Sequence, residues 1–343
     1  MATAKKSSAS DLPIASREVT EAEVKNFDLS PHLIRLMWDE PFFARVLRGV
    51  NKIKTTAIPT AGVLAKDDDI NFWWNPRFLA GLTAKQIKGL IKHECYHLVF
   101  EHTTTRRHDP HVIWNYSTDL AINSLIAEDE LPEGGLIPSK PFTPLTEEQK
   151  EKFGPKAVEN YEMISRKIAS FPKNKNSEWY FSALMEDEEV REAIENGQDA
   201  QSLMDALANG DVKIDENGNL VDQDGNPVNI VPGGMDDHEG WDNLNEEQKE
   251  LIKGKIEQAL KEAVKECDAK NSWGSVSSDM QTTLRKMISS EIPWQSVLKQ
   301  FCGMTRRADR SSSVRRLNRK YPAIHPGTQR NYKANIAVYL DQS

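Results

Sequence analysis

Residues 83–99 carry the feature that most constrains this chain, a helical pattern that contains two histidines one turn apart. Thr83 and Gln86 have the spacing of a capping box. Apolar residues then recur at helical intervals, at Ile87, Leu90, Ile91, Leu98 and Val99. Within this pattern the sequence His93-Glu94-Cys95-Tyr96-His97 reads HExxH. A spacing of four places both imidazoles on one face of a helix, where they can reach a single tetrahedral metal ion.

The chemistry of this motif favours a catalytic zinc site. Neutral imidazoles, a carboxylate and an open position for water suit Zn²⁺ better than Ca²⁺ or Mg²⁺. We therefore predict one zinc ion per chain, with His93 and His97 as ligands. Glu94 lies beside them and is predicted to be the general base, taking a proton from the water that the metal activates. The alternative, two surface histidines on an ordinary helix, is disfavoured because the motif lies inside a capped amphipathic helix.

A catalytic zinc site requires a third protein ligand, and several candidates lie a short distance downstream. They are Glu101, His102, His108, His111 and Asp119. His102 comes near the end of the same helix, so its direction toward the same metal is expected to be poor. His108 lies in a charged connection and resembles the loop histidine of other zinc hydrolases.

Asp119 is the preferred third ligand. Asn115, Asp119 and Asn123 follow one another at intervals of four and form a polar stripe on an otherwise apolar helix. Such a stripe needs polar partners, which a metal and its histidines would supply. We predict Asp119 as ligand, Asn115 or Asn123 as an outer partner or substrate contact, and His108 as the alternative ligand. A solvated helix face is the other interpretation of the stripe.

Two further residues are weaker candidates for contact with a substrate. Tyr96, inside the motif, either packs in the core or contacts an oxyanion. His238 lies in an acidic, turn-rich segment, about 186–242, from which it could approach the site. A plain loop is the favoured interpretation of His238.

Composition excludes several classes of protein. No apolar run approaches the roughly 18 residues that span a bilayer, and residues 1–16 lack the apolar stretch of a secretory signal. Three widely spaced cysteines argue against a disulfide framework. We expect a cytoplasmic protein without a membrane partner. The net charge of −8 and the lack of aromatics in the Arg-rich run 305–320 argue against nucleic-acid binding.

Three blocks resemble, in order, the metallopeptidase domain of bacterial and phage proteins that continue into a VWA-like (von Willebrand factor A) domain. They are Asn71–Phe78, the HExxH motif and Trp114–Asn123. The apolar run Ala334–Leu340 and the following Asp341-Gln342-Ser343 resemble the first strand of such a domain and the opening of its metal-ion-dependent adhesion motif. The resemblance implies a longer protein, in which Asp341 and Ser343 would bind Mg²⁺ only within a complete VWA-like domain.

The predicted fold is α+β: a mainly helical, zincin-like domain with a small β-sheet, followed by the first strand of a truncated VWA-like α/β domain. The boundaries are a disordered tail at 1–18, the metallopeptidase-like domain at 19–304 with the insertion at about 186–242, an Arg-rich linker at 305–333, and the start of the VWA-like domain at 334–343.

The predicted function is that of a zinc-dependent hydrolase, a metallopeptidase acting on a peptide or protein substrate. The alternative is a non-catalytic adaptor whose metal site is structural or vestigial. It would work through the VWA-like domain with an AAA+ ATPase, a partner that the family resemblance implies. The sequence specifies neither a cleavage site nor an oligomeric state.

Overall fold

The computed structural model describes residues 19–66, 69–102, 106, 108–199, 206, 211–214, 220–226, 228–231, 246–289, 310–318, 320 and 325–330. The chain divides into two units, Met1–Leu284 and Arg285–Ser343. The predicted tail at 1–18, His238, the boundary at 304 and the predicted VWA-like segment 334–343 lie outside the described residues.

The first unit begins with short helices that lead into a three-stranded sheet. The helices are α1 (Glu21–Asn26), α2 (Ser30–Asp39), α3 (Pro41–Val46) and the 3-10 turn η1 (Leu47–Gly49), and the strands are β1 (Asn51–Lys54), β2 (Ala61–Lys66) and β3 (Asp69–Trp74). The strand order is β1-β3-β2, with β1 parallel and β2 antiparallel to β3. Val63 pairs with Phe72, and both are buried. The aromatic and β-branched residues of β2 and β3 thus face the core.

Two helices of this unit carry the residues singled out by the sequence. After α4 (Pro76–Gly81) come α5 (Ala84–Val99) and α6 (His111–Asn123), which contact each other. The predicted capping box of α5 is present: Gln86 N–H donates to Thr83 Oγ1 at 3.3 Å, and Thr83 N–H donates to Gln86 Oε1 at 2.9 Å. From residue 89 to residue 99 every side of α5 is buried. α5 is therefore a central helix and not a surface helix.

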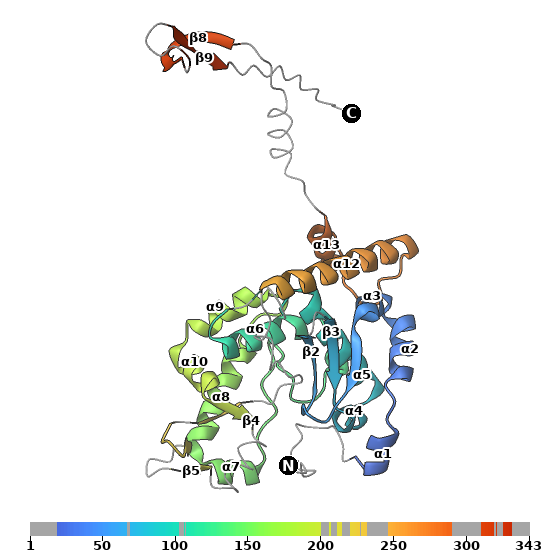
Figure 1. The fold of residues 1–343 in the computed structure, drawn as a ribbon. Coiled ribbons are helices and arrows are strands. Elements are labelled where there is room, and N and C mark those ends of the chain that lie inside the picture. Colours follow the sequence, from blue (N-terminus) through green and yellow to red (C-terminus); the bar gives the residue numbers. More distant parts are fainter. Residues whose placement is uncertain are drawn as a thin grey trace, which may run out of the picture. The chain divides into compact units, whose positions relative to one another are not determined.

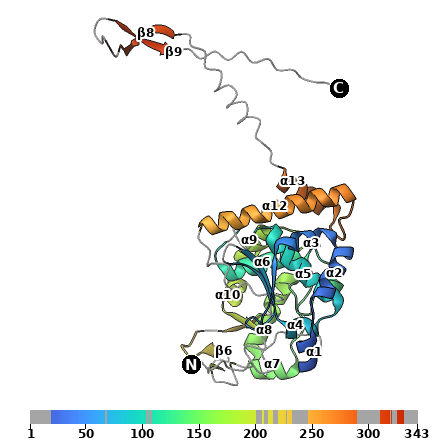
Figure 2. The same cartoon turned by 45° about the vertical axis from the view of Figure 1, so that its right-hand side comes forward.

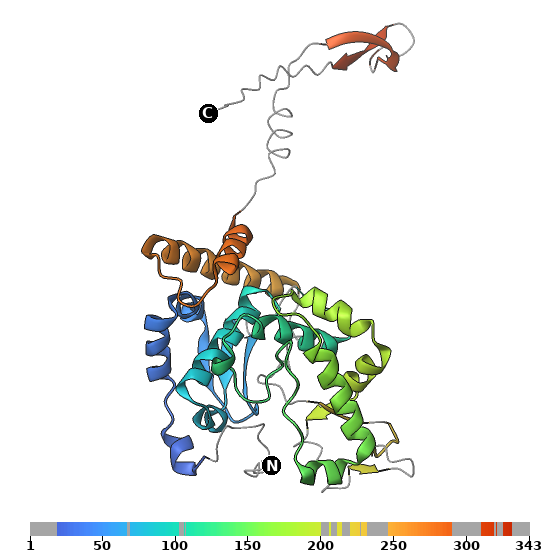
Figure 3. The same ribbon diagram turned by 180° about the vertical axis from the view of Figure 1, so that it is seen from behind.

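A second group of elements follows α6. It comprises η2 (Glu128–Glu130), α7 (Glu147–Phe153), α8 (Pro155–Ala169), α9 (Ser177–Met185), α10 (Glu188–Glu195) and the short strands β4 (Gly197–Asp199), β5 (Val212–Ile214), β6 (Leu220–Asp222) and β7 (Asn229–Val231). Of these elements, α9 and α10 contact α6 directly. Ile113 and Leu120 of α6 belong to a hydrophobic core that they share with residues of α7–α10 and β5–β7. Seen from behind, α5 and α6 lie between the N-terminal helices and helices α7–α10 (Figure 3). The predicted insertion thus contributes α10 and β4–β7.

Helix α12 (Glu246–Lys270) closes the first unit by packing across α3 and α5 (Figures 1 and 2). Glu266 of α12 forms an ion pair with Arg45 of α3, in which Glu266 Oε2 lies 2.8 Å from Arg45 Nε. Lys270 Nζ also donates to Glu266 Oε1, at 2.8 Å. Helix α13 (Ser278–Ile288) follows.

The Arg-rich segment, for which the sequence predicts a linker, contains the antiparallel strands β8 (Arg310–Leu317) and β9 (Pro326–Arg330). Arg310 pairs with Arg330, and Ser312 with Thr328. The sequence does not predict these strands because the segment offers few of the apolar residues that mark a half-buried strand.

The described structure is α+β and mainly helical, as predicted. None of its described helices combines the length and hydropathy that a membrane span requires.

The ion pair between α3 and α12 predicts a pH dependence of stability. Hydrogen bonds from Arg45 and Lys270 lower the pKa of Glu266 from 4.5 to about 2. A depressed folded-state pKa stabilises the fold above the unfolded value, and this contribution disappears as the pH falls through the folded value. We expect Glu266→Gln to reduce the free energy of unfolding most above pH 4.5 and progressively less as the pH falls through 2, as measured by denaturant titrations at a series of pH values.

Glu257→Gln is the matched control, because Glu257 lies exposed on the same helix with one lysine 3.6 Å away. It should change stability little at any pH. If the wild type and Glu266→Gln lose stability in parallel on acidification, ionised Glu266 does not stabilise the contact between α3 and α12.

Candidate metal centre

Helices α5 and α6 bring together the three residues predicted to be metal ligands. His93 Nε2 lies 2.9 Å from His97 Nε2. Asp119 Oδ1 lies 3.4 Å from His97 Nε2 and 3.7 Å from His93 Nε2. All three residues are buried, and among the described residues they are the one group of His, Cys, Asp and Glu side chains that could hold a metal ion.

These distances fit a metal site of tetrahedral geometry. Ligand atoms about 2.0–2.1 Å from a tetrahedral zinc lie about 3.3 Å from one another. The three observed separations, 2.9, 3.4 and 3.7 Å, bracket that value. Two imidazole nitrogens and a carboxylate oxygen are also a donor set that suits Zn²⁺. The residues present therefore fit the metal that the motif predicts.

Asn123 fixes the orientation of His93. Its Oδ1 lies 2.8 Å from His93 Nδ1, and its Nδ2 donates to the Leu136 carbonyl at 2.9 Å. The second bond sets which end of the amide faces the ring, so Nδ1–H of His93 donates and Nε2 presents its lone pair. This arrangement is the usual outer support of a metal-binding histidine. Of the two asparagines predicted as outer partners, Asn123 contacts a predicted ligand. Asn115 Nδ2 instead lies 3.3 Å from His111 Nδ1.

The remaining predicted residues occupy different surroundings. Glu94 is buried on α5, 1% exposed, next to His93. His108, the alternative ligand, is exposed and packs against Trp114 and Phe181 with ring centroids 4.5 and 5.2 Å away. It does not belong to the group formed by His93, His97 and Asp119.

Tyr96 and Cys95 face the hydrophobic core. The Tyr96 ring packs against Phe43 and Phe100, with centroid distances of 5.1 and 5.5 Å. Burial raises the pKa of the Tyr96 phenol and of the Cys95 thiol. Both groups are therefore neutral at physiological pH. Of the two interpretations of Tyr96, the structure favours core packing.

Two residues behind His97, His102 and Ser177, make contacts that the sequence does not predict. His102, treated only as a poorly directed candidate ligand, has its Nδ1 3.3 Å from His97 Nδ1. Its Nε2 lies 3.3 Å from Ser177 Oγ on α9, and both residues are buried. Spacing alone could not show this contact, because it depends on how the chain turns after α5.

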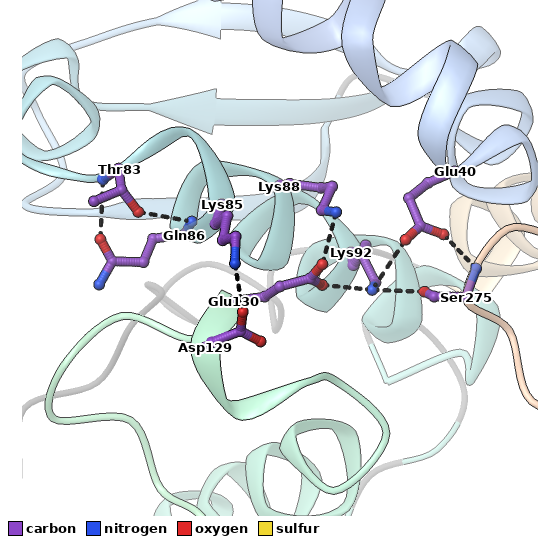
Figure 4. Close-up of polar contacts among 9 residues, drawn as sticks. All are labelled: Glu40, Thr83, Lys85, Gln86, Lys88, Lys92, Asp129, Glu130 and Ser275. Carbon is purple, nitrogen blue, oxygen red and sulfur yellow. Dashed lines mark hydrogen bonds and ion pairs between the residues drawn. The ribbon is translucent and has the colours of Figure 1, made fainter.

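A buried ionic network holds α5 from another side (Figure 4). The Lys92 side chain is 2% exposed, and its Nζ donates to Glu130 Oε2 and Ser275 Oγ, each at 2.7 Å. Nζ also lies 3.4 Å from Glu40 Oε1, and Glu40 Oε2 accepts from the Ser275 N–H at 2.8 Å. Burial raises the pKa of Glu130, but the hydrogen bonds from Lys88 and Lys92 outweigh this and leave it below its ordinary value. Helix α5 is thus fixed to three separate segments.

Two glycines make this network possible. A Cβ at Gly89 would lie 1.9 Å from the Glu130 carbonyl oxygen, so only glycine lets η2 approach α5 this closely. Gly274 has a φ of +62°, and a Cβ there would lie 2.4 Å from Glu40 Oε2. Both positions therefore require glycine for steric reasons.

Removal of the buried cation should destabilise the fold. Lys92→Met leaves Glu40 and Glu130 without their shared cation, and breaking a buried ion pair typically costs about 3–5 kcal/mol. The matched control is Lys85→Met on the same helix, since Lys85 and its partner Asp129 are 68% and 64% exposed. It should cost less than about 1 kcal/mol. Urea unfolding measures both changes, and equal losses in the two variants would refute this role of Lys92.

The comparisons with known proteins agree with this geometry. A family described as "Putative metallopeptidase domain" matches residues 25–336. A protein of Thermotoga maritima described as uncharacterized is 23% identical over 325 residues, which cover 92% of this chain and 68% of that protein. No solved structure matches the chain. Because the family match extends over most of the sequence and includes all three grouped residues, the chain belongs to the putative metallopeptidase domain family.

Proposed function

We propose that this protein is a zinc-dependent hydrolase, a metallopeptidase, in which His93, His97 and Asp119 hold the metal and Glu94 is the general base. The observation that carries the proposal is the spacing of the three buried ligand atoms, 2.9–3.7 Å apart, on two packed helices. Family membership supports a metal-dependent hydrolase in general. Zinc and the individual roles are our inference from the donor set.

The residues of the site divide the chemistry between them. A bound zinc ion would supply a Lewis acid that lowers the pKa of water and polarises a carbonyl group. His93 and His97 would bind it as neutral ligands through Nε2, while Asp119 contributes one negative charge. The Glu94 carboxylate would accept the proton of the attacking water and later pass it to the leaving amine. Peptide bonds are the substrate class that best suits this division of roles.

The charges present are suited to a dication. Asp119 and Glu94 together contribute two negative charges, and both side chains are almost fully buried. A divalent cation at the ligand atoms would balance the charge of this part of the helix pair.

The first test separates metal binding from catalysis. Glu94→Gln keeps the shape of the side chain and removes its basicity, so it should retain zinc and lose about 10²–10⁴-fold of the hydrolytic rate. Zinc content is measured by elemental mass spectrometry and hydrolysis with a fluorescence-quenched peptide library, with His93→Ala as the metal-free control. A zinc-loaded Glu94→Gln protein with full activity would remove Glu94 from the mechanism. A zinc-loaded wild type that cleaves nothing would favour the adaptor function, in which a VWA-like domain and an AAA+ ATPase are partners.

The second test concerns the third ligand. Asp119→Ala should weaken zinc binding by more than about 100-fold, beyond the loss expected for an outer partner. Asn115→Ala is the matched control, because Asn115 lies one turn earlier on α6 and contacts His111 instead of the ligand group. Competition with a chromogenic chelator gives both affinities. Unchanged zinc affinity in Asp119→Ala would show that another residue completes the site.

A further inference from the structure

The chain reverses at the end of α5 in a way that brings His102 back onto His97. Glu101 has a φ of +59°, in the left-handed region. The His102 N–H donates to the His97 carbonyl and the Glu101 N–H to the Leu98 carbonyl, each at 3.0 Å. These two bonds define a Schellman motif, whose last residue lies over the residue five positions earlier. In this chain that pair is His102 and the ligand His97.

The side chains of His97 and His102 also contact each other. His97 Nε2 faces His93 and Asp119, and its Nδ1 lies 3.3 Å from His102 Nδ1. A histidine that offers Nε2 to a metal carries its proton on Nδ1, so His97 donates to His102. His102 then carries its own proton on Nε2, which lies 3.3 Å from Ser177 Oγ. One arrangement of protons therefore satisfies both hydrogen bonds, from His97 to His102 and from His102 to Ser177 of α9.

We propose that His102 is a positioning residue for the metal site: it accepts from His97 Nδ1, fixes the tautomer and ring orientation of His97, and is itself held by Ser177. This inference rests on the proposed function, because it assumes that His97 binds the metal. The His102 side chain is fully buried and packs edge-on against Trp114, with ring centroids 5.8 Å apart. Its ring thus has little freedom to turn away.

His102 does for His97 what Asn123 does for His93, but from a different direction. Asn123 reaches His93 from α6, whereas His102 lies just beyond the end of the metal helix and is fastened to α9. Arg106, further along the same connection, forms an ion pair with Glu178, the residue after Ser177. The start of α9 is therefore part of the support of the metal site.

The test measures zinc affinity, not activity. His102→Phe keeps the size of the ring but removes the acceptor, and loss of such an outer partner typically lowers metal affinity about 10–100-fold. His102→Asn places Oδ1 near the position of the lost Nδ1, so it should restore an affinity close to that of the wild type. Glu101→Gly is the control, since glycine adopts the same left-handed backbone and should leave zinc binding unchanged. Competition with a chromogenic chelator gives the affinities, and melting of the zinc-free proteins shows that each variant is folded.

The outcomes separate this inference from the function on which it rests. A wild-type protein that binds no zinc would overturn the metal site itself. If the wild type binds zinc and the His102→Phe variant binds it equally tightly, the proposed role of His102 is overturned but the metal site is not. Equal loss of zinc affinity in His102→Phe and His102→Asn would also overturn the role of His102. It would show that the acceptor restored by asparagine does not matter and that His102 acts through packing. Weakening in Phe with recovery in Asn is the supporting result.

Discussion

From residue 89 to residue 99, helix α5 is buried on every side. A helix in this position is expected to be apolar all round, yet this one carries Lys92, His93, Glu94 and His97. A buried polar group without a partner is costly, so each of these side chains must be satisfied by the elements that surround the helix. The packing of the first unit follows from that requirement: α6 supplies Asp119 and Asn123, and η2 supplies Glu130.

The same requirement gives the proposed metal site its rigidity. The Lys92 network holds α5 through contacts with residues that are 38, 52 and 183 positions away in the sequence. A shift of the helix by a fraction of a turn would break these contacts as well as those of His93 and His97. The proposed ligands are therefore held in place by contacts within the protein, and the cost of ordering them is met during folding, as preorganised sites require.

The local part of this architecture is visible in the sequence, and the long-range part is not. The HExxH helix and its capping box follow from spacing alone, and the polar stripe on an apolar helix favours Asp119 as the third ligand because such a stripe needs partners. β1 was not predicted because Asn-Lys-Ile-Lys is polar and largely exposed. The contact of His102 with His97 depends on the left-handed backbone of Glu101. A glycine at that position would have indicated such a turn, but a glutamate does not. The partners of Lys92 lie too far along the chain for any periodic pattern to reveal them.

The choice of partners behind the two histidines also bears on the electrostatics of the site. Metal-binding histidines often donate to a carboxylate, which raises their basicity and adds negative charge. Here the partners are the amide of Asn123 and, in the proposed arrangement, the neutral imidazole of His102. In the proposed site, Asp119 and the neighbouring Glu94 supply negative charge close to the metal position. Two such charges balance a divalent ion, whereas further carboxylates would reduce its ability to polarise a carbonyl. In the proposed function, neutral outer partners would orient the ligands and leave a bound metal strongly electrophilic, which is what a hydrolytic site needs.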